Sequence, residues 1–248
     1  MPVEILPLQG LPDVRPGGDI AQAIVEATRA KSMRIVENDI FVVAQKIVSK
    51  SEGRIVRLDQ VVPSEQACRW AEKWSKDARF IELVLRESKR IVRMERGIII
   101  AETHHGFVCA NAGIDASNTE EGTAALLPEN PDASARALQV RLSEAFACHV
   151  GVIVSDTFGR AWREGLVNVA LGVAGLSPLL DYRGLHDANG KPLHATVIAV
   201  ADELAAAAEL VMGKADRIPV AIIRGAKIAM RPGSGFELIR SAEKDLFR

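Results

Sequence analysis

The chain of 248 residues is long enough to bury a sizeable core without disulfides or structural metals. Apolar residues make up 48% of it and charged residues 25%, with a net charge of −1, which is typical of a globular protein and argues against a dedicated nucleic-acid binder or a polybasic membrane protein. No apolar run reaches the roughly 18 residues of a membrane helix, and the N-terminal residues do not resemble a signal peptide. The cysteines Cys68, Cys109 and Cys148 fit reduced core residues of a cytoplasmic protein.

The first half of the chain predicts two helices and two short strands. Asp19 is placed to cap an amphipathic helix, whose apolar residues recur at helical spacing. Residues 39–44 and 53–58 read as strands. Residues 64–88 predict one long, charge-rich helix that carries Trp70 and Trp74 on one face.

The second half mixes both kinds of element. Residues 91–101 and 106–110 predict two strands around a turn at residues 103–106. Further strands are predicted at 150–154, 193–200 and 219–224, and helices at 132–147, 164–174 and 201–212. The mixture of hairpins and crossovers indicates an α+β (mixed α/β) fold.

A polar segment follows the apolar strand at 150–154, where Ser155, Asp156 and Thr157 come in succession. Ligands gather beyond the carboxyl ends of strands in open α/β sheets, and a carboxylate with a hydroxyl suits Mg²⁺ or Mn²⁺. The alternative is that Asp156 caps a following helix. Both interpretations remain open from the sequence.

A second polar loop, with Asp115 and Asn118, follows the strand that is predicted to end near Ala110. An Asx turn is the alternative to a ligand site. Two acids after separate strands are able to share one or two cations, and such a site would clamp phosphates.

Lys46 and Lys50 follow the strand at 39–44, with Ser49 between them and Ser51 directly after, a combination that suits phosphate or carboxylate binding. Taken alone, a surface turn is the favoured interpretation. The loop at residues 10–14 reads as a structured terminus. His104 and His105 have no metal-ligand spacing and read as a solvated turn.

These segments, in this order, resemble the coenzyme F420 gamma-glutamyl ligase family. Each match is weak alone, but the ordered set spans nearly the whole chain. The matching segments are residues 4–7, 10–13, 46–53, 112–118, 155–163, 201–203, 210–214, 219–225 and 245–247.

The resemblance implies an enzyme that joins L-glutamate to a carboxylate of a deazaflavin coenzyme F420 precursor, with GTP cleaved to GDP and phosphate, and that adds later glutamates through gamma linkages. It implies Mg²⁺ or Mn²⁺ as the divalent cation, with two such ions expected, together with a monovalent cation such as K⁺. It also implies a family-specific α+β fold in an intertwined homodimer, a cytoplasmic location, and no nucleic-acid or membrane partner. Residues 1–248 are expected to form one catalytic unit without the C-terminal flavin-binding domain that some relatives carry.

The resemblance assigns roles residue by residue. It makes Asp115 and Asp156 metal ligands, and Thr157 a ligand of the second metal. The residues it implies in GTP binding are Leu11, Pro12, Asp13, Val14, Gln45, Lys50, Asn118, Met212, Gly213 and Lys214. Gln45 stands where relatives commonly have serine, and Lys214 replaces a glutamine that reaches the second metal in some relatives. No catalytic base is identified.

Two other classes of function use the same residues. A metal-dependent nucleotide phosphatase or nucleotidyl transferase would cleave nucleotide without glutamate, and a non-catalytic nucleotide-binding protein would keep only the fold. The aromatic face of the 64–88 helix, with Phe80 and Ile81, predicts either a dimer interface or a core within one subunit.

Overall fold

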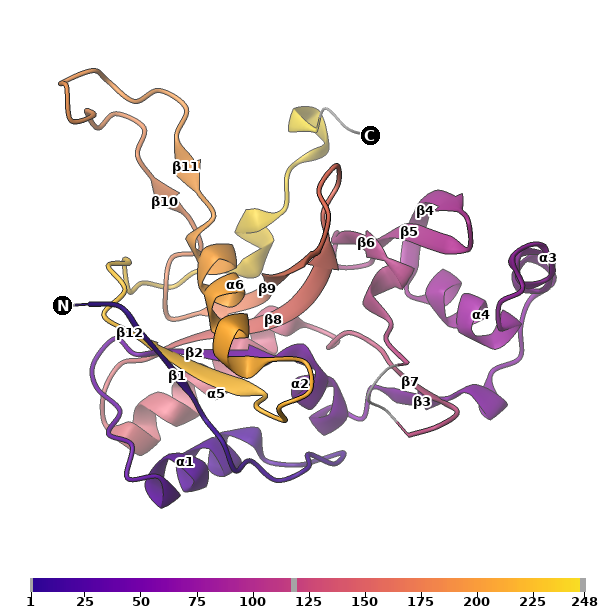
Figure 1. The fold of residues 1–248 in the computed structure, drawn as a ribbon, viewed down its shortest axis with the longest axis horizontal. Helices are drawn as coiled ribbons and strands as arrows, with labels where there is room; N and C mark the ends of the chain where they lie inside the picture. Colours follow the sequence, from indigo (N-terminus) through magenta and orange to yellow (C-terminus); the bar gives the residue numbers. More distant parts are fainter. Residues whose placement is uncertain (1, 117–119, 246–248) are drawn as a thin grey trace.

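The computed structural model describes residues 2–116 and 120–245, and it has a mixed α and β architecture (Figure 1). Its centre is a five-stranded sheet in the order β1-β12-β2-β8-β9. The strands are β1 (Glu4–Pro7), β2 (Ile40–Ala44), β8 (Gly151–Gly159), β9 (Leu166–Ala174) and β12 (Val220–Arg224). Among the described residues of this sheet, β2 and β8 pair in parallel and the other neighbours pair antiparallel. No helix in the described ranges is long and apolar enough to cross a lipid bilayer.

Helices cover both faces of this sheet, so its central strands are apolar on both sides. On one face, α1 (Ile20–Ala30) and α5 (Pro131–Phe146) pack with alternate residues of β2 and β8. On the other face, α6 (Val200–Met212) packs against the remaining alternate residues. Asp19 caps α1 as predicted, by accepting a hydrogen bond from the Gln22 amide. The predictions of β2, α5, α6 and β12 are confirmed to within one residue at each end.

The sequence prediction of a helix at 164–174 is wrong, because this segment is strand β9. It forms a long antiparallel hairpin with β8, which itself continues five residues beyond the predicted end at Val154. The pairing register shifts between Val154 and Ser155. Such bulges re-aim the side chains that follow them and are common next to active sites. Because β8 extends to Gly159, Asp156 lies inside a strand, and the interpretation of Asp156 as a helix cap is wrong.

A smaller lobe is formed by residues 55–116 and 120–125. It contains the antiparallel sheet β4-β5-β6, the pair β3 (Ile55–Arg57) with β7 (Thr123–Ala125), and two helices. The sheet strands are β4 (Ser88–Glu95), β5 (Ile98–Thr103) and β6 (Val108–Ala110). The hairpin of β5 and β6 around residues 103–106 is confirmed, whereas 91–101 is not one strand, because residues 96 and 97 form a tight turn.

The predicted long helix at 64–88 is two helices, α3 (Glu65–Trp74) and α4 (Ala78–Arg86). Ser75 ends α3 in the left-handed conformation, and Asp77 caps α4. Ile81 is buried in the core of the smaller lobe, and Trp70 and Phe80 pack against that core. These side chains favour the interpretation of a core within one subunit. Cys68 is exposed, contrary to the expectation that the cysteines are core residues.

A two-stranded arm projects from the central sheet between β9 and α6 (Figure 1). It consists of β10 (Leu180–Asp181), β11 (Val197–Ile198) and the chain between them. Of the predicted strand at 193–200, only the two residues of β11 are confirmed, and Val200 already begins α6. Leu185 and Val197 are exposed apolar residues of this arm.

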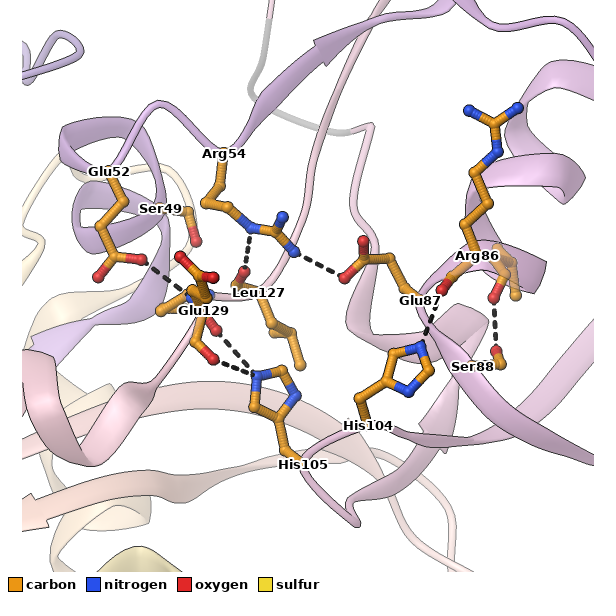
Figure 2. A network of polar contacts seen from close by, with 12 residues as sticks. Ser49, Glu52, Arg54, Arg86, Glu87, Ser88, His104, His105, Leu127 and Glu129 are labelled. Carbon is orange, nitrogen blue, oxygen red and sulfur yellow. Dashed lines mark hydrogen bonds and ion pairs between the residues drawn. The ribbon is translucent and has the colours of Figure 1, made fainter.

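Polar contacts fix the smaller lobe against the central sheet (Figure 2). Arg54 donates to the Leu127 carbonyl at 3.0 Å and to the Glu87 carboxylate at 2.6 Å. The ring of His105 donates through Nε2 to the Pro128 and Glu129 carbonyls, both at 3.0 Å. The two lobes are thereby joined by bonds to backbone as well as by side-chain packing.

The histidine turn is confirmed, but it is a structural turn rather than a solvated one. His104 is exposed and donates to the Arg86 carbonyl at 2.9 Å, while His105 stacks on Phe107. Phe107 in turn packs edge-on against Phe158 at the far end of β8, with ring centroids 6.3 Å apart. The smaller lobe therefore packs directly on the part of β8 that follows the bulge.

Candidate functional site

The polar end of β8 forms the centre of the candidate site. Beyond the bulge, Thr157 pairs directly across the hairpin with Asn168 of β9, so both side chains lie on the same face of the hairpin. The Thr157 hydroxyl donates to Asn168 Oδ1 at 2.6 Å. The Asn168 amide then donates to Glu209 of α6 at 2.9 Å. Lys214, just after α6, donates through Nζ to Thr157 Oγ1.

Asp115 reaches this centre from the smaller lobe. Its backbone bridges Ala125 of β7, donating to the Ala125 carbonyl at 3.0 Å and accepting from its amide at 2.8 Å. Its carboxylate forms an ion pair of 2.6 Å with Lys46. Lys46 lies in α2 (Gln45–Ser51), which begins directly where β2 ends. The surface turn expected at residues 46–50 is therefore a helix.

The electrostatics of Asp156 show that these groups converge. Burial raises the pKa of its carboxyl to about 6; a hydrogen bond from the Thr157 amide and the charges of Lys214 and Lys46 act in the opposite direction, while Asp115 raises it further. Across the described part of the chain, no cation lies within ion-pair distance of Asp156. The site thus contains a partly buried carboxylate whose neighbouring lysines are engaged elsewhere.

Cys109 of β6 lies on the smaller-lobe side of Asp156. Burial raises the pKa of its thiol to about 12, and the charge of Asp156 adds to that rise. A thiol with such a pKa stays protonated at neutral pH and is unsuited to nucleophilic chemistry. Cys109 is therefore a buried neighbour of Asp156 and not a candidate nucleophile.

The remaining residues implied in nucleotide binding lie on several elements. In the loop before α1, Leu11 and Val14 are partly buried against the core, and Pro12 and Asp13 are exposed. The end of this loop is bonded to the end of α2, because Gly17 donates to the Ser51 carbonyl at 2.8 Å. Lys50 lies in the last turn of α2 and is partly buried.

Other residues implied in nucleotide binding lie at the start of α2 and at the end of α6. Gln45 is buried at the start of α2, where its Oε1 accepts from the Ser49 hydroxyl at 2.8 Å; its Nε2 has no hydrogen-bond partner among the described residues. Met212 is the last residue of α6, and its side chain is buried in the core that this helix covers. Gly213 follows as the C-cap of the helix. Asn118 lies outside the described residues.

Comparison with known proteins identifies the family of this chain. Residues 10–225 match the family model described as F420-0:Gamma-glutamyl ligase. The chain belongs to the F420-0:gamma-glutamyl ligase family. Over its whole length it is 47% identical to the coenzyme F420:L-glutamate ligase of Methanothermobacter thermautotrophicus, across 100% of both chains.

Two further relatives carry the same name. The protein of Methanopyrus kandleri is 45% identical, across 99% of this chain and 97% of its own. That of Archaeoglobus fulgidus is 41% identical, across 100% of this chain and 97% of its own. The chain is therefore an enzyme of this ligase family, as the resemblance implied.

The candidate site has carboxylates that could hold a divalent cation, at Asp115 and Asp156. Both carboxylates supply hard oxygen ligands, and Asp156 has no ion-pair partner among the described residues. Within the described residues, no group of three or more His, Cys, Asp or Glu side chains forms an all-protein metal cage. Mg²⁺ typically binds through one or two carboxylates together with substrate phosphates, so this donor set fits a cation that binds together with a phosphate group.

Sequence reasoning misses or underrates three residues of the candidate site. It does not single out Asn168 or Glu209, because the first falls in a predicted helix and the second on an ordinary helix face. It identifies Lys46 only as one of two lysines in a predicted turn. A polar Asn168 inside an apolar run was the available signal for the first of these.

Proposed function

We propose that this enzyme adds L-glutamate to the deazaflavin coenzyme F420 precursor, with GTP cleaved to GDP and phosphate and an acyl phosphate as the intermediate. The single observation that carries the proposal is the convergence of Asp115, Asp156, Lys46 and Lys214 on the end of β8 in a chain of this family. The names of the relatives support the substrate assignment.

The arrangement of charge supports phosphoryl transfer. A carboxylate is inert toward an amine at neutral pH, because the group that must leave is oxide. In the proposed first step, a precursor carboxylate oxygen attacks the γ-phosphorus of GTP, the bond to the β-phosphate bridging oxygen breaks, and GDP leaves. Negative charge spreads over the γ-phosphate during this step, where fixed cations stabilise it most. Lys50 and Lys46 on α2, and Lys214 after α6, are the fixed cations we assign to the nucleotide.

A divalent cation held by Asp115 and Asp156, when bound, would neutralise phosphate charge and orient the transferred group. The two carboxylates come from different lobes, so the contacts across the junction position one against the other. Leu11 to Val14, Gln45, Met212 and Gly213 would line the nucleotide through backbone or packing contacts. Further stimulation by a monovalent cation such as K⁺ is part of the proposal.

In the second step, the glutamate amine attacks the acyl carbon, and phosphate leaves with the carbon–oxygen bonding pair. The amine must lose a proton as the amide forms. The reaction therefore consumes one GTP for each glutamate that is added.

One assay tests the proposal. The protein is incubated with GTP, Mn²⁺, L-glutamate and the deazaflavin precursor, and the products are analysed by mass spectrometry. A mass increase of one glutamate residue, with equal GDP and phosphate, is expected, and it should vanish when any component is omitted. GTP cleavage at the same rate without glutamate and precursor would indicate a phosphatase instead.

We also propose that the enzyme is a homodimer. The arm of β10 and β11 is a two-stranded ribbon that exposes Leu185 and Val197, and such ribbons are rarely stable without a covering surface. A second copy of the chain would cover it. Light scattering at micromolar and nanomolar concentrations should give twice the 26.8 kDa chain mass. A stable folded species with the mass of one chain would contradict the dimer.

A further inference from the structure

The Thr157 hydroxyl is oriented by its neighbours to present its oxygen to a cation. A hydroxyl has one proton and two lone pairs. Thr157 gives its proton to Asn168 Oδ1, at 2.6 Å. Asn168 cannot turn its amide toward Thr157 without losing its bond to Glu209, at 2.9 Å. The lone pairs of Thr157 Oγ1 are therefore left for a positively charged partner.

Lys214 supplies that positive charge from within the chain. Its Nζ donates to Thr157 Oγ1, and its charge acts on the neighbouring Asp156 carboxyl. An ammonium is a compact point charge with three donors, so one of its protons serves Thr157 while the others remain for a phosphate oxygen. A divalent cation ligated by the same hydroxyl would lie where the ammonium lies, and the two positive charges would repel each other.

We propose that the Lys214 ammonium takes the place of a second divalent cation at Thr157, so that this site binds one divalent cation, at Asp115 and Asp156, with each nucleotide. The inference rests on the proposed GTP-binding function. It changes the expectation of two divalent cations to one, and it assigns Thr157, Asn168 and Glu209 to the positioning of Lys214.

The test counts Mn²⁺ bound with nucleotide, and it needs no turnover. Equilibrium dialysis with a GTP analogue whose β–γ bridge is nitrogen, followed by metal analysis, gives Mn²⁺ per bound nucleotide. The wild-type protein should bind one. Lys214→Gln should bind two, because the glutamine oxygen and Thr157 are then free to ligate a second ion.

Two further variants test whether the additional Mn²⁺ binds at Thr157. Lys31→Gln, at the end of α1 on the opposite face of the sheet, removes the same charge away from the site and should leave one Mn²⁺. Lys214→Gln combined with Thr157→Val should return the count from two to one, because the added ion loses its hydroxyl ligand. A second ion that persists in this double variant lies elsewhere, and the inference is then wrong.

Other outcomes overturn the inference as well. Two Mn²⁺ in the wild-type protein would show that Lys214 does not exclude the second ion. A count of one in Lys214→Gln, with turnover that newly requires K⁺, would assign the ammonium to the place of a monovalent cation. If the counts are as expected but no glutamate is added in the ligase assay, the substrate assignment fails while the cation inference stands.

Discussion

Replacement of Thr157 by valine tests the hydrogen-bonded chain at the centre of the site. Valine has nearly the shape of threonine but lacks the hydroxyl, so the substitution leaves Asn168 Oδ1 without its donor. The Asn168 side chain is buried, at 5% exposure, so water cannot replace that donor easily. An unsatisfied buried acceptor costs about 1–3 kcal/mol, which is the expected loss in the free energy of unfolding.

Two comparisons separate the hydrogen bond from packing. Thr157→Ser keeps the hydroxyl and removes one methyl group, so it should cost only about 0.8 kcal/mol or less. Lys214 is exposed and regains water when Thr157 is changed, so its contribution to stability is small. Thr157→Val with Asn168→Leu removes both polar partners and should be less destabilised than the sum of the single variants.

Urea unfolding, followed by tryptophan fluorescence and checked by circular dichroism, measures these differences. If the free energy of unfolding of Thr157→Val lies within about 0.5 kcal/mol of the wild-type value, and the substitutions at Thr157 and Asn168 show no coupling energy, the hydrogen-bonded chain does not exist in solution. That result would also remove the structural basis for positioning Lys214.

Three other predictions concern separate parts of the molecule. Asp156→Asn keeps the side-chain shape and should abolish GTP turnover at saturating Mn²⁺ with the circular dichroism spectrum unchanged; near-normal turnover would contradict the cation site. Lys50→Ala should weaken nucleotide binding in calorimetry by about 1–3 kcal/mol, and unchanged affinity would exclude a phosphate contact. Asp39→Asn should lower the free energy of unfolding by about 3 kcal/mol, because the buried Asp39 carboxylate binds the Arg224 guanidinium through contacts of 2.9 and 2.7 Å. Equal urea midpoints for Asp39→Asn and the wild-type protein would refute that estimate.

Local signals in the sequence were sufficient for the elements that carry their own caps and periodicity. The helix after Asp19 and the strand at β2 follow from a capping residue and a short apolar run. The break between α3 and α4 was also encoded locally, since Ser75 and Asp77 are a left-handed end and a cap. The continuous helical spacing of the flanking aromatic residues concealed that break.

Local sequence patterns cannot predict strand β9, for a physical reason. Its small and apolar residues are compatible with a buried helix or with a strand, and short apolar runs do not distinguish the two by periodicity. Its pairing with β8 decides the outcome, and that pairing is a tertiary contact. The same limit applied to Lys46 and Lys214, whose partners Asp115 and Thr157 lie 57 or more residues away in the chain.

The location of the site follows from the unequal lengths of two parallel strands. β2 and β8 pair from Ile40 with Gly151 to Ala44 with Ser155, and there β2 ends in helix α2. β8 continues to Gly159 with only β9 described as its paired neighbour in the sheet. Beyond this point three charged side chains gather around Asp156 and Thr157: Lys46 from α2, Asp115 from the smaller lobe, and Lys214 from the end of α6. Because a strand buried on both faces tolerates little charge, Asp156 is accommodated only beyond this point. The change from apolar to polar residues at Ser155 thus marks the place where β2 leaves the sheet and the candidate site begins.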